Sequence, residues 1–272
     1  MKKRVLSILT AAVFAAISLA GCGASKLPAD DKVIKVAATA VPHAQILEAA
    51  KPILAQQGYT LEIQVFDDYV QPNEVVESGD FDCNFFQHTP YLESFNEEKG
   101  THLVNVGEIH YEPLGIYPGQ ETSLEDLKEG STIAVPNDTT NEARALLLLQ
   151  DNGIITLKEG AGITATVNDI AHNPYDVDIV ELDAAQIART LPDVSFGVLN
   201  GNYAMQAGLN AREDALAYEE ADSVAARTYV NIIVVKEGAE KHKDVQALVE
   251  VLKSDAITQF INENYEGAVI PF

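Results

Sequence analysis

Arg144 and Asn141 stand three residues apart, directly after the polar turn at residues 136–138, and together could hold an anion. Residues three apart share one face of a helix. A helix that begins after this turn would also offer free N–H groups and a positive dipole end to a negative group. The Arg144 guanidinium can bind a carboxylate through two parallel hydrogen bonds. In a chain with 41 acidic residues, Arg144 could instead lie on the surface and pair with Glu142 or another acid.

Two further amides, Asn200 and Asn202, flank Gly201 directly after the apolar segment 196–199. A side-chain amide both donates and accepts hydrogen bonds, so this pair could accept from an ammonium group and donate to a carboxylate. The other interpretation is a plain turn, because Asn-Gly is a common turn dipeptide.

Ring-bearing side chains cluster in one short segment that contains Phe85, Phe86, His88 and Tyr91. Tyr69 adds another ring after the preceding strand pattern. Such a cluster can form the wall of an apolar pocket with a polar edge. The alternative is that these rings are ordinary core side chains.

The elements that must position these residues alternate between strand and helix patterns. Strands are predicted over residues 33–39, 61–66, 103–109, 114–117, 132–135, 178–182, 196–199 and 229–235. Helices are predicted over residues 44–57, 123–128 and 141–151, and one or two more over 244–264. This alternation predicts an α/β fold with largely parallel sheets. Because ligands of such sheets bind at the carboxyl ends of strands, polar segments that follow strands are the best site candidates.

The first residues have the order of a secretory signal peptide. Residues 2–4 are basic, residues 5–20 are apolar and uncharged, and Leu19-Ala20-Gly21-Cys22 closes the segment. The closing motif looks like a bacterial lipobox, which implies acylation of Cys22, a signal peptide over 1–21 and a tether over 22–31. We therefore expect a protein anchored by lipid to the cell membrane, on its extracytoplasmic face. The alternative is an ordinary signal peptide with an incidental cysteine.

Charge and cysteine content exclude several classes of protein. The 272 residues carry a net charge of −23, which repels nucleic acid and anionic lipid headgroups. Cys83 is the only cysteine besides Cys22, so we expect no disulfide framework. Its apolar surroundings favour a small buried residue rather than a nucleophile.

Two further classes are disfavoured by the absence of motifs. The sequence has no Gly-x-Ser-x-Gly elbow, no His-Glu-x-x-His helix and no phosphate loop, so an enzyme is not expected. The six histidines, at positions 43, 88, 102, 110, 172 and 242, show no close-spaced pair typical of zinc sites. We therefore expect neither a metal nor a cofactor, although a metal-binding lipoprotein and a surface adhesin stay open as alternatives.

Taken together, the motifs resemble the methionine-binding lipoprotein family of bacterial ABC importers (the NlpA/MetQ type). The resemblance covers nearly the whole chain after the lipobox. It is carried by Val41-Pro42-His43-Ala44, Asp68-Tyr69-Val70, Pro72-Asn73, Phe86-Gln87-His88, Pro90-Tyr91-Leu92, Val135-Pro136-Asn137-Asp138, Asn141, Arg144 with the leucines at 146–149, and Tyr229-Val230-Asn231.

The resemblance implies a periplasmic-binding-protein fold of type II, with a ligand cleft between two hinged lobes. On matching positions, lobe 1 would comprise residues 32–111 and 229–272, and lobe 2 residues 112–228. The ligand's carboxylate and amine would meet Arg144, Asn141 and Asn200, with Asn202 as a further candidate. Its apolar side chain would lie among Tyr69, Phe86, His88 and Tyr91.

The implied function is to capture methionine, as the L- and also the D-form, and to deliver it as a monomer to ABC permease and ATPase subunits. Another small amino acid or a methionine-containing dipeptide is the alternative ligand. Two departures from the family pattern could alter the pocket. One is Phe85, where a smaller residue or Tyr is expected, and the other is the segment 110–113 at the crossover between lobes.

Overall fold

The structure is a computed structural model that describes residues 32–272. The predicted signal peptide, Cys22 and the tether lie outside the described residues. Among residues 32–272, the helices are all too short or too polar to cross a membrane.

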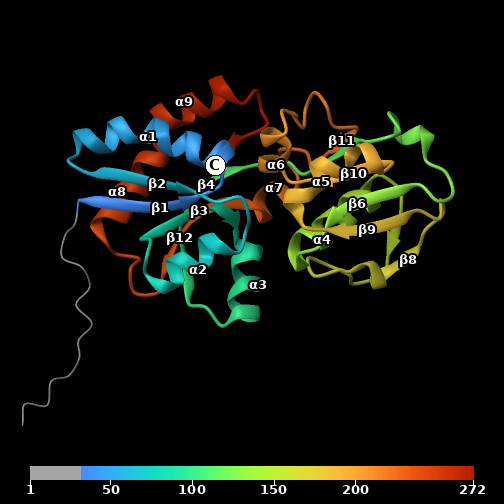
Figure 1. The fold of residues 1–272 in the computed structure, drawn as a ribbon, viewed down its shortest axis with the longest axis horizontal. Helices are drawn as coiled ribbons and strands as arrows, with labels where there is room; N and C mark the ends of the chain where they lie inside the picture. The colour runs from blue at the N-terminus through green and yellow to red at the C-terminus, as the bar shows by residue number, and fades with distance from the viewer. Residues whose placement is uncertain (1–31) are drawn as a thin grey trace, which may run out of the picture. The chain divides into compact units, whose positions relative to one another are not determined.

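The first of two main sheets has six strands in the order β13-β4-β12-β3-β1-β2 (Figure 1). Its strands are β1 (Val33–Ala38), β2 (Thr60–Val65), β3 (Cys83–His88), β4 (Leu103–Tyr111), β12 (Val230–Lys236) and β13 (Ile270–Pro271). β1, β2 and β3 run parallel to one another, whereas β12 is antiparallel to both β3 and β4. At one end of these strands, the register places Asn231 of β12 between His88 of β3 and His110 of β4.

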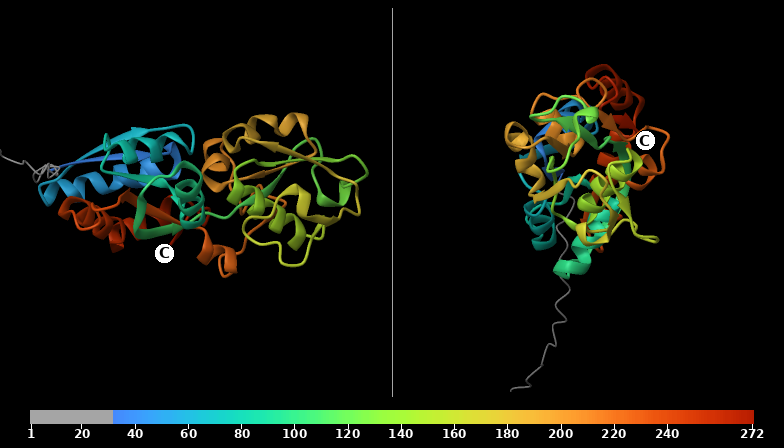
Figure 2. Two further views of the ribbon diagram at one scale, coloured as in Figure 1. Left: turned by 90° about the horizontal axis from the view of Figure 1, so that it is seen from below. Right: turned by 90° about the vertical axis from the view of Figure 1, so that its right-hand side faces the viewer.

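Helices cover both faces of this sheet. They are α1 (Gln45–Gln56), α2 (Gln71–Ser78), α3 (Thr89–Lys99), α8 (Lys243–Leu252) and α9 (Asp255–Asn264). Alternate residues of β12 point to opposite faces. Ile233 packs with α1, α8 and α9, and Ile232 packs with α2 and α3. Figure 2 shows from two directions that the C-terminal helices, in red, lie beside the N-terminal elements, in blue.

The second sheet has five strands in the order β11-β5-β10-β6-β9. They are β5 (Gly115–Pro118), β6 (Thr132–Pro136), β9 (Asp178–Leu182), β10 (Phe196–Leu199) and β11 (Ala217–Tyr218). The surrounding helices are α4 (Thr139–Asp151), α5 (Ala184–Thr190), α6 (Gly201–Gln206) and α7 (Val224–Thr228). The remaining elements are a π-helical segment at Ala40–Ala44 before α1, a small hairpin, β7 (Thr156–Leu157) with β8 (Ile170–His172), and short 3-10 turns at Leu124–Asp126, Val167–Asp169 and Leu191–Asp193.

Helix α4 fixes the position of both Asn141 and Arg144. Asp138 is its N-cap and accepts a hydrogen bond from the backbone N–H of Asn141 at 3.1 Å. The leucine-rich second half of α4 is buried against β5, β6 and β10, with Leu146 completely covered. The cap and the buried leucines therefore hold one end and one face of this helix.

The expected α/β fold is confirmed, but two details differ. The sheets are not largely parallel, because β12 and β5 each return antiparallel to their neighbours. The helix predicted at residues 123–128 is a single 3-10 turn, Leu124–Asp126, capped by Ser123. The pattern at residues 244–264, predicted as one or two helices, forms two, separated at Lys253 and Ser254. Cys83 is completely buried in the first core, as expected, and burial raises the pKa of its thiol.

We expect Leu146→Ala to lower the free energy of unfolding by about 2–5 kcal/mol, because it leaves a cavity beside α4. Leu147 is the matched control, since it lies next in the same helix but is only partly buried. Urea unfolding followed by circular dichroism measures both variants. Equal losses for the two would contradict the described packing of α4.

Candidate functional site

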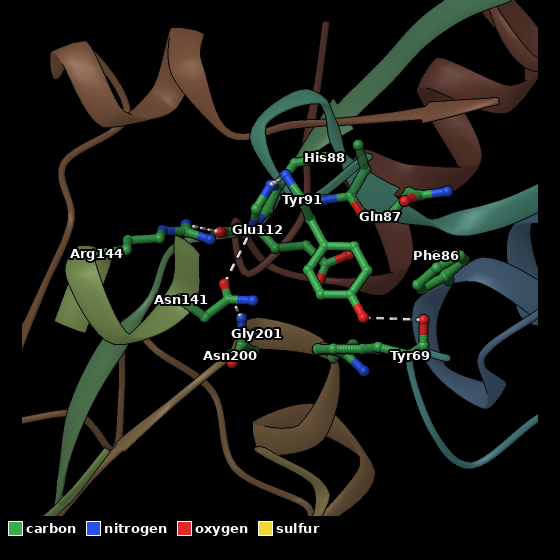
Figure 3. Close-up of a pocket in the computed structure, with 12 residues that line it drawn as sticks. Tyr69, Phe86, Gln87, His88, Tyr91, Glu112, Asn141, Arg144, Asn200 and Gly201 are labelled. Carbon is green, nitrogen blue, oxygen red and sulfur yellow. Dashed lines mark hydrogen bonds between the residues drawn. The ribbon is translucent and has the colours of Figure 1, made fainter. Parts of the chain in front are cut away.

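A pocket lies between the two sheets. Figure 3 shows its lining, with Arg144 at one end and Phe86 at the other. The lining residues are Tyr69, Phe86, Gln87, His88, Tyr91, Glu112, Asn141, Arg144, Asn200, Gly201, Asn202 and Asn231. The eight candidate ligand-binding residues from the sequence are all in this set. Most of them follow the carboxyl end of a strand: β2, β3, β6 or β10.

One wall of the pocket is aromatic. Tyr69 lies with its ring centroid 5.7 Å from that of Phe86 and 5.7 Å from that of Tyr91. On the other side, the ring of Tyr203 approaches Tyr69 to 5.0 Å. Phe86 and Tyr91 are buried and also line the pocket, so the pocket-wall and core interpretations both hold for them.

Phe85 differs from its neighbours because β3 alternates. Its side chain is completely buried in the first core, where it meets the edges of His43 at 4.7 Å and His110 at 5.2 Å. It is absent from the pocket lining, so this departure from the family pattern acts on the histidines behind the pocket. The other departure does reach the pocket, through Glu112.

Arg144 is buried, with 4 % of its surface exposed, and pairs with Glu219 rather than with Glu142. Its Nε donates to Oε1 of Glu219 at 2.8 Å, and its Nη2 donates to Oε2 at 2.5 Å. The guanidinium also lies 4.3 Å from the ring centre of Tyr229. Glu142 instead accepts a hydrogen bond from the backbone N–H of Val167.

The Arg144 guanidinium is therefore charged and held in one orientation, and only some of its hydrogen-bond donors have partners. Burial lowers its pKa, but the charge of Glu219 and the hydrogen bonds to it outweigh burial and raise the pKa. Its Nη2 also donates to the backbone carbonyl of Glu112 at 2.9 Å. Among the described residues, its Nη1 has no hydrogen-bond partner, so this nitrogen is available to a bound anion.

Asn141 links the two sheets. Its Oδ1 accepts from His88 Nε2 at 3.1 Å and from Asn200 Nδ2 at 2.8 Å, while its Nδ2 donates to Asp138. His88 accepts a hydrogen bond from the backbone of Tyr91 through Nδ1, so its Nε2 carries the proton that Asn141 receives. Burial, followed by the charge of Arg144, lowers the pKa of His88 to about 3, so the ring is neutral.

Two amide atoms in the pocket have no partner among the described residues. They are Oδ1 of Asn200, an acceptor, and Nδ2 of Asn202, a donor. The other ends of these amides are occupied: Asn200 donates to Asn141, and Asn202 accepts from Tyr69. Since buried amide atoms are normally hydrogen-bonded, this pair offers one acceptor and one donor to a ligand. Asn200 and Asn202 therefore do more than form a turn, because each presents an unpaired amide atom.

Sequence reasoning did not select four lining residues: Gln87, Glu112, Gly201 and Asn231. Gln87 and Asn231 belong to motifs that carry the family resemblance, and both sit on strands next to His88. Gly201 lies so close to Glu112 that an added Cβ would come within 2.7 Å of the Glu112 Cβ. That closeness arises between two distant segments, so the sequence alone gives no sign of it.

A cluster of three buried groups bears on the metal alternative: Glu112, which lines the pocket, and His43 and His110 behind it. Their ligand atoms are all within 4.8 Å of one another, although 67 residues separate the two histidines along the chain. Spacing in the sequence could not reveal this cluster, because tertiary folding brings its members together.

Comparison with known proteins gives consistent results. Residues 34–272 match the family model described as NlpA lipoprotein. The methionine-binding lipoprotein MetQ of Bacillus subtilis is 40 % identical, over 100 % of this chain and 99 % of its own. A lipoprotein structure from Ruminococcus gnavus is 69 % identical with a TM-score of 0.88, covering 89 % of this chain and all of that one.

A nutrient-binding protein from Burkholderia cenocepacia, whose structure is bound to methionine, is 41 % identical with a TM-score of 0.83. That alignment covers 88 % of this chain and 99 % of the other. The family match extends over almost all described residues, and the relatives align over nearly their full lengths. The chain belongs to the NlpA lipoprotein family.

Proposed function

We propose that this protein captures methionine in the pocket between the two sheets and delivers it to an ABC permease. The observation that carries the proposal is the division of the pocket, with aromatic rings at one end and a partly unsatisfied guanidinium at the other. A free amino acid with an apolar side chain has the same two ends. The methionine held by the Burkholderia cenocepacia relative supports this ligand over other small amino acids.

The aromatic end suits a thioether. Tyr69, Phe86 and Tyr91 pack against one another, with ring centroids 5.7–6.0 Å apart, and together form an aromatic wall of the pocket. A sulfur against an aromatic ring gains roughly 0.3–1.5 kcal/mol per contact.

The polar end suits a carboxylate. The free Nη1 of Arg144 and the free Nδ2 of Asn202 are both donors, and the unpaired Oδ1 of Asn200 is an acceptor. A carboxylate that receives these donors would satisfy Nδ2 of Asn202, which is otherwise buried without a partner, and would pair with the charge of Arg144. In this proposal Asn141 orients Asn200 and His88, in addition to facing the ligand.

Two lobes would close around the ligand. We propose that residues 32–111 with 229–272 form one lobe and residues 112–228 the other, each built on one of the two main sheets. Hydrogen bonds across the pocket, such as Tyr69 to Asn202 at 2.5 Å, then belong to the closed form. A monomer anchored by lipid at Cys22 would present this form to the permease from the extracytoplasmic side of the membrane.

We expect Arg144→Ala to weaken methionine binding by about 2–5 kcal/mol, a roughly 30- to 4,000-fold rise in Kd, because a buried carboxylate loses its charged partner. Isothermal titration calorimetry measures this effect. Arg189→Ala removes an exposed arginine and should leave Kd unchanged. Arg144→Ala with near-native affinity would refute the proposed role.

Stability of the same variant needs a separate measurement, because Arg144→Ala also leaves Glu219 buried without its partner. Breaking such a pair costs about 3–5 kcal/mol. If Arg144→Ala unfolds, the double variant with Glu219→Gln removes the orphaned charge and allows the titration. Binding by the double variant at the native level would count equally against the proposal.

Tyr69→Phe should raise the Kd for methionine modestly, by about 2- to 12-fold, since one hydrogen bond across the pocket is worth about 0.5–1.5 kcal/mol. The ring itself remains, so the thioether contact is kept. Tyr59→Phe, which alters a tyrosine packed against the first core and away from the pocket, is the control. A loss as large as that of Arg144→Ala would mean that the Tyr69 hydroxyl contacts the ligand directly.

A further inference from the structure

Glu112 is a buried carboxylate placed where the chain passes from β4 to β5. Only 5 % of its surface is exposed, and it lines the pocket. In Figure 3 its side chain extends behind the ring of Tyr91 toward the middle of the pocket. His110 Nε2 lies 2.7 Å from its Oε1, and His43 Nε2 lies 3.3 Å from the same oxygen.

The hydrogen-bond pattern fixes which histidine nitrogens carry protons. Nε2 of His43 faces two acceptors, Glu112 Oε1 and, at 3.0 Å, Asn231 Oδ1, so it must be the protonated nitrogen. Its Nδ1 then accepts from the Thr39 hydroxyl at 2.7 Å. Nε2 of His110 also lies against Glu112 Oε1, while its Nδ1 has no partner among the described residues. The surroundings thus fix His43 as a donor toward Glu112, and His110 donates to the same oxygen when Glu112 is ionised.

Both histidines are neutral, so neither balances the charge of Glu112. Burial lowers the pKa of His110 to about 3. Burial also lowers the pKa of His43 to about 4, although the Glu112 charge acts in the opposite direction. The nearest permanent cation, Arg144, forms its ion pair with Glu219 and reaches only the backbone carbonyl of Glu112.

Glu112 is thus a carboxylate with hydrogen-bond donors but no cation. Burial raises its pKa, while His43, Arg144 and the backbone N–H of Asn202 act to lower it. A buried charge of this kind is costly unless a partner of opposite charge binds. His110 and His43 approach Oε1, and Oε2 lies beside Gly201. The carboxylate also accepts from the backbone N–H of Asn202, so a cationic partner would use the acceptor capacity that remains on Oε2.

The position of Glu112 relative to Arg144 matches the backbone of an amino acid. Both groups line one pocket, and the Arg144 side chain contacts the main chain of Glu112. A zwitterion needs a cationic and an anionic receptor close together, and this pair provides them. Gly201 allows the second sheet to approach Glu112 closely, because any side chain there would collide with it.

We propose that Glu112 receives the ammonium group of the bound amino acid, and that His43 and His110 are positioning residues that orient this carboxylate toward the pocket. The inference rests on the proposed amino-acid-binding function and extends it, because it restricts ligands to those with a free α-ammonium group. Compounds that keep the carboxylate and the thioether but lack the amine would lose this interaction.

The test is a cycle of two ligands and two proteins, measured by calorimetry at neutral pH. The ligands are L-methionine and 4-(methylsulfanyl)butanoate, which lacks only the amine. Glu112→Gln should weaken methionine binding by about 30-fold or more. It should change binding of the desamino compound by less than about threefold, because that compound has no cation to lose. Glu108→Gln, an exposed acid on the same strand, is the matched control.

The outcomes separate this inference from the function on which it rests. If wild-type protein binds no methionine, the proposed function fails, and the inference fails with it. If wild-type protein binds methionine and Glu112→Gln binds it equally well, only the inference fails. Equal losses for both ligands would also overturn it, since the effect would then be structural rather than directed at the amine.

A pH profile tests the histidines. The groups that face Glu112 are, element by element, His43 before α1, Tyr69 before α2, His110 on β4, Arg144 on α4 and Tyr265 after α9. Methionine affinity should be full above the pKa of Glu112 and fall as the pH decreases through it. Because burial raises that pKa, the fall begins at a higher pH than an ordinary carboxyl group would give.

His110→Leu removes a donor to the carboxylate, so the fall in affinity should move to still higher pH. His110→Gln keeps an N–H donor near the same place and should restore the profile toward that of wild type. His172→Leu changes an exposed histidine and is the control. A His110→Leu profile identical in shape to wild type would overturn the positioning role.

A metal ion in the cluster is the competing explanation, and zinc titration decides it. The 2.7 Å hydrogen bond between His110 and Glu112 fills the place where a zinc ion would need bonds of about 2.0–2.2 Å to each. We therefore expect no stoichiometric binding of Zn²⁺ alone to the wild-type protein. One equivalent of tightly bound zinc that is lost in Glu112→Gln would overturn the inference and assign a metal site instead.

Discussion

The ion pair between Arg144 and Glu219 is the constraint on which the rest of the site depends. Glu219 follows β11, near the point where the chain returns to the first sheet, and also accepts hydrogen bonds from the Tyr111 hydroxyl and the Leu114 backbone. Arg144 adds a hydrogen bond to the Glu112 carbonyl. One guanidinium therefore connects α4 to both crossovers between the sheets, where the proposed hinge would bend. A charge held there would give the proposed ligand an anion receptor in a fixed position.

Burying an ion pair of this kind costs free energy, and the contribution of this pair to the site is the orientation that it gives to the guanidinium. Desolvation of two charges can exceed their mutual attraction, so a buried pair is weak evidence for stability. Here Glu219 accepts hydrogen bonds from Nε and Nη2, whereas Nη1 makes no hydrogen bond to the described residues. The guanidinium is thus already desolvated and aligned before any ligand arrives. The Arg144 side chain is therefore ordered during folding rather than on binding, so the entropy cost of ordering it does not reduce the affinity for the ligand.

The sequence predicted the fold class and much of the pocket because both depend on local patterns. Strands β9 and β10 appear at their predicted bounds, since their apolar runs are flanked by clear turn signals. Arg144 and Asn141 were identifiable because helix periodicity places residues three apart on one face. The aromatic segment around Phe86 was identifiable by its density of rings. Features within about ten residues of one another were therefore accessible to sequence reasoning.

Features that depend on distant contacts were not accessible. Nothing near Glu219 in the sequence marks it as the partner of Arg144, which lies 75 residues away along the chain. The antiparallel strand β12 reaches the middle of the first sheet only after the whole second sheet has been built. The grouping of His43, His110 and Glu112 likewise exists only after β4 has joined its sheet. These features follow from tertiary packing, which periodicity and spacing do not encode.

The distribution of satisfied and unsatisfied groups suggests how the proposed closure depends on ligand. Closing brings direct hydrogen bonds across the pocket, from Tyr69 to Asn202 and from Tyr203 to the Asp67 backbone. Each such bond contributes about 0.5–1.5 kcal/mol. The same closure buries the unpaired amide atoms of Asn200 and Asn202, each at a cost of about 1–3 kcal/mol. When the pocket is empty, the cost of about 2–6 kcal/mol for the two unpaired atoms exceeds the gain of about 1–3 kcal/mol from the two hydrogen bonds, so a ligand that pairs these atoms decides the balance. A pocket that satisfied every polar group by itself would close without methionine, and its closure would not depend on the ligand.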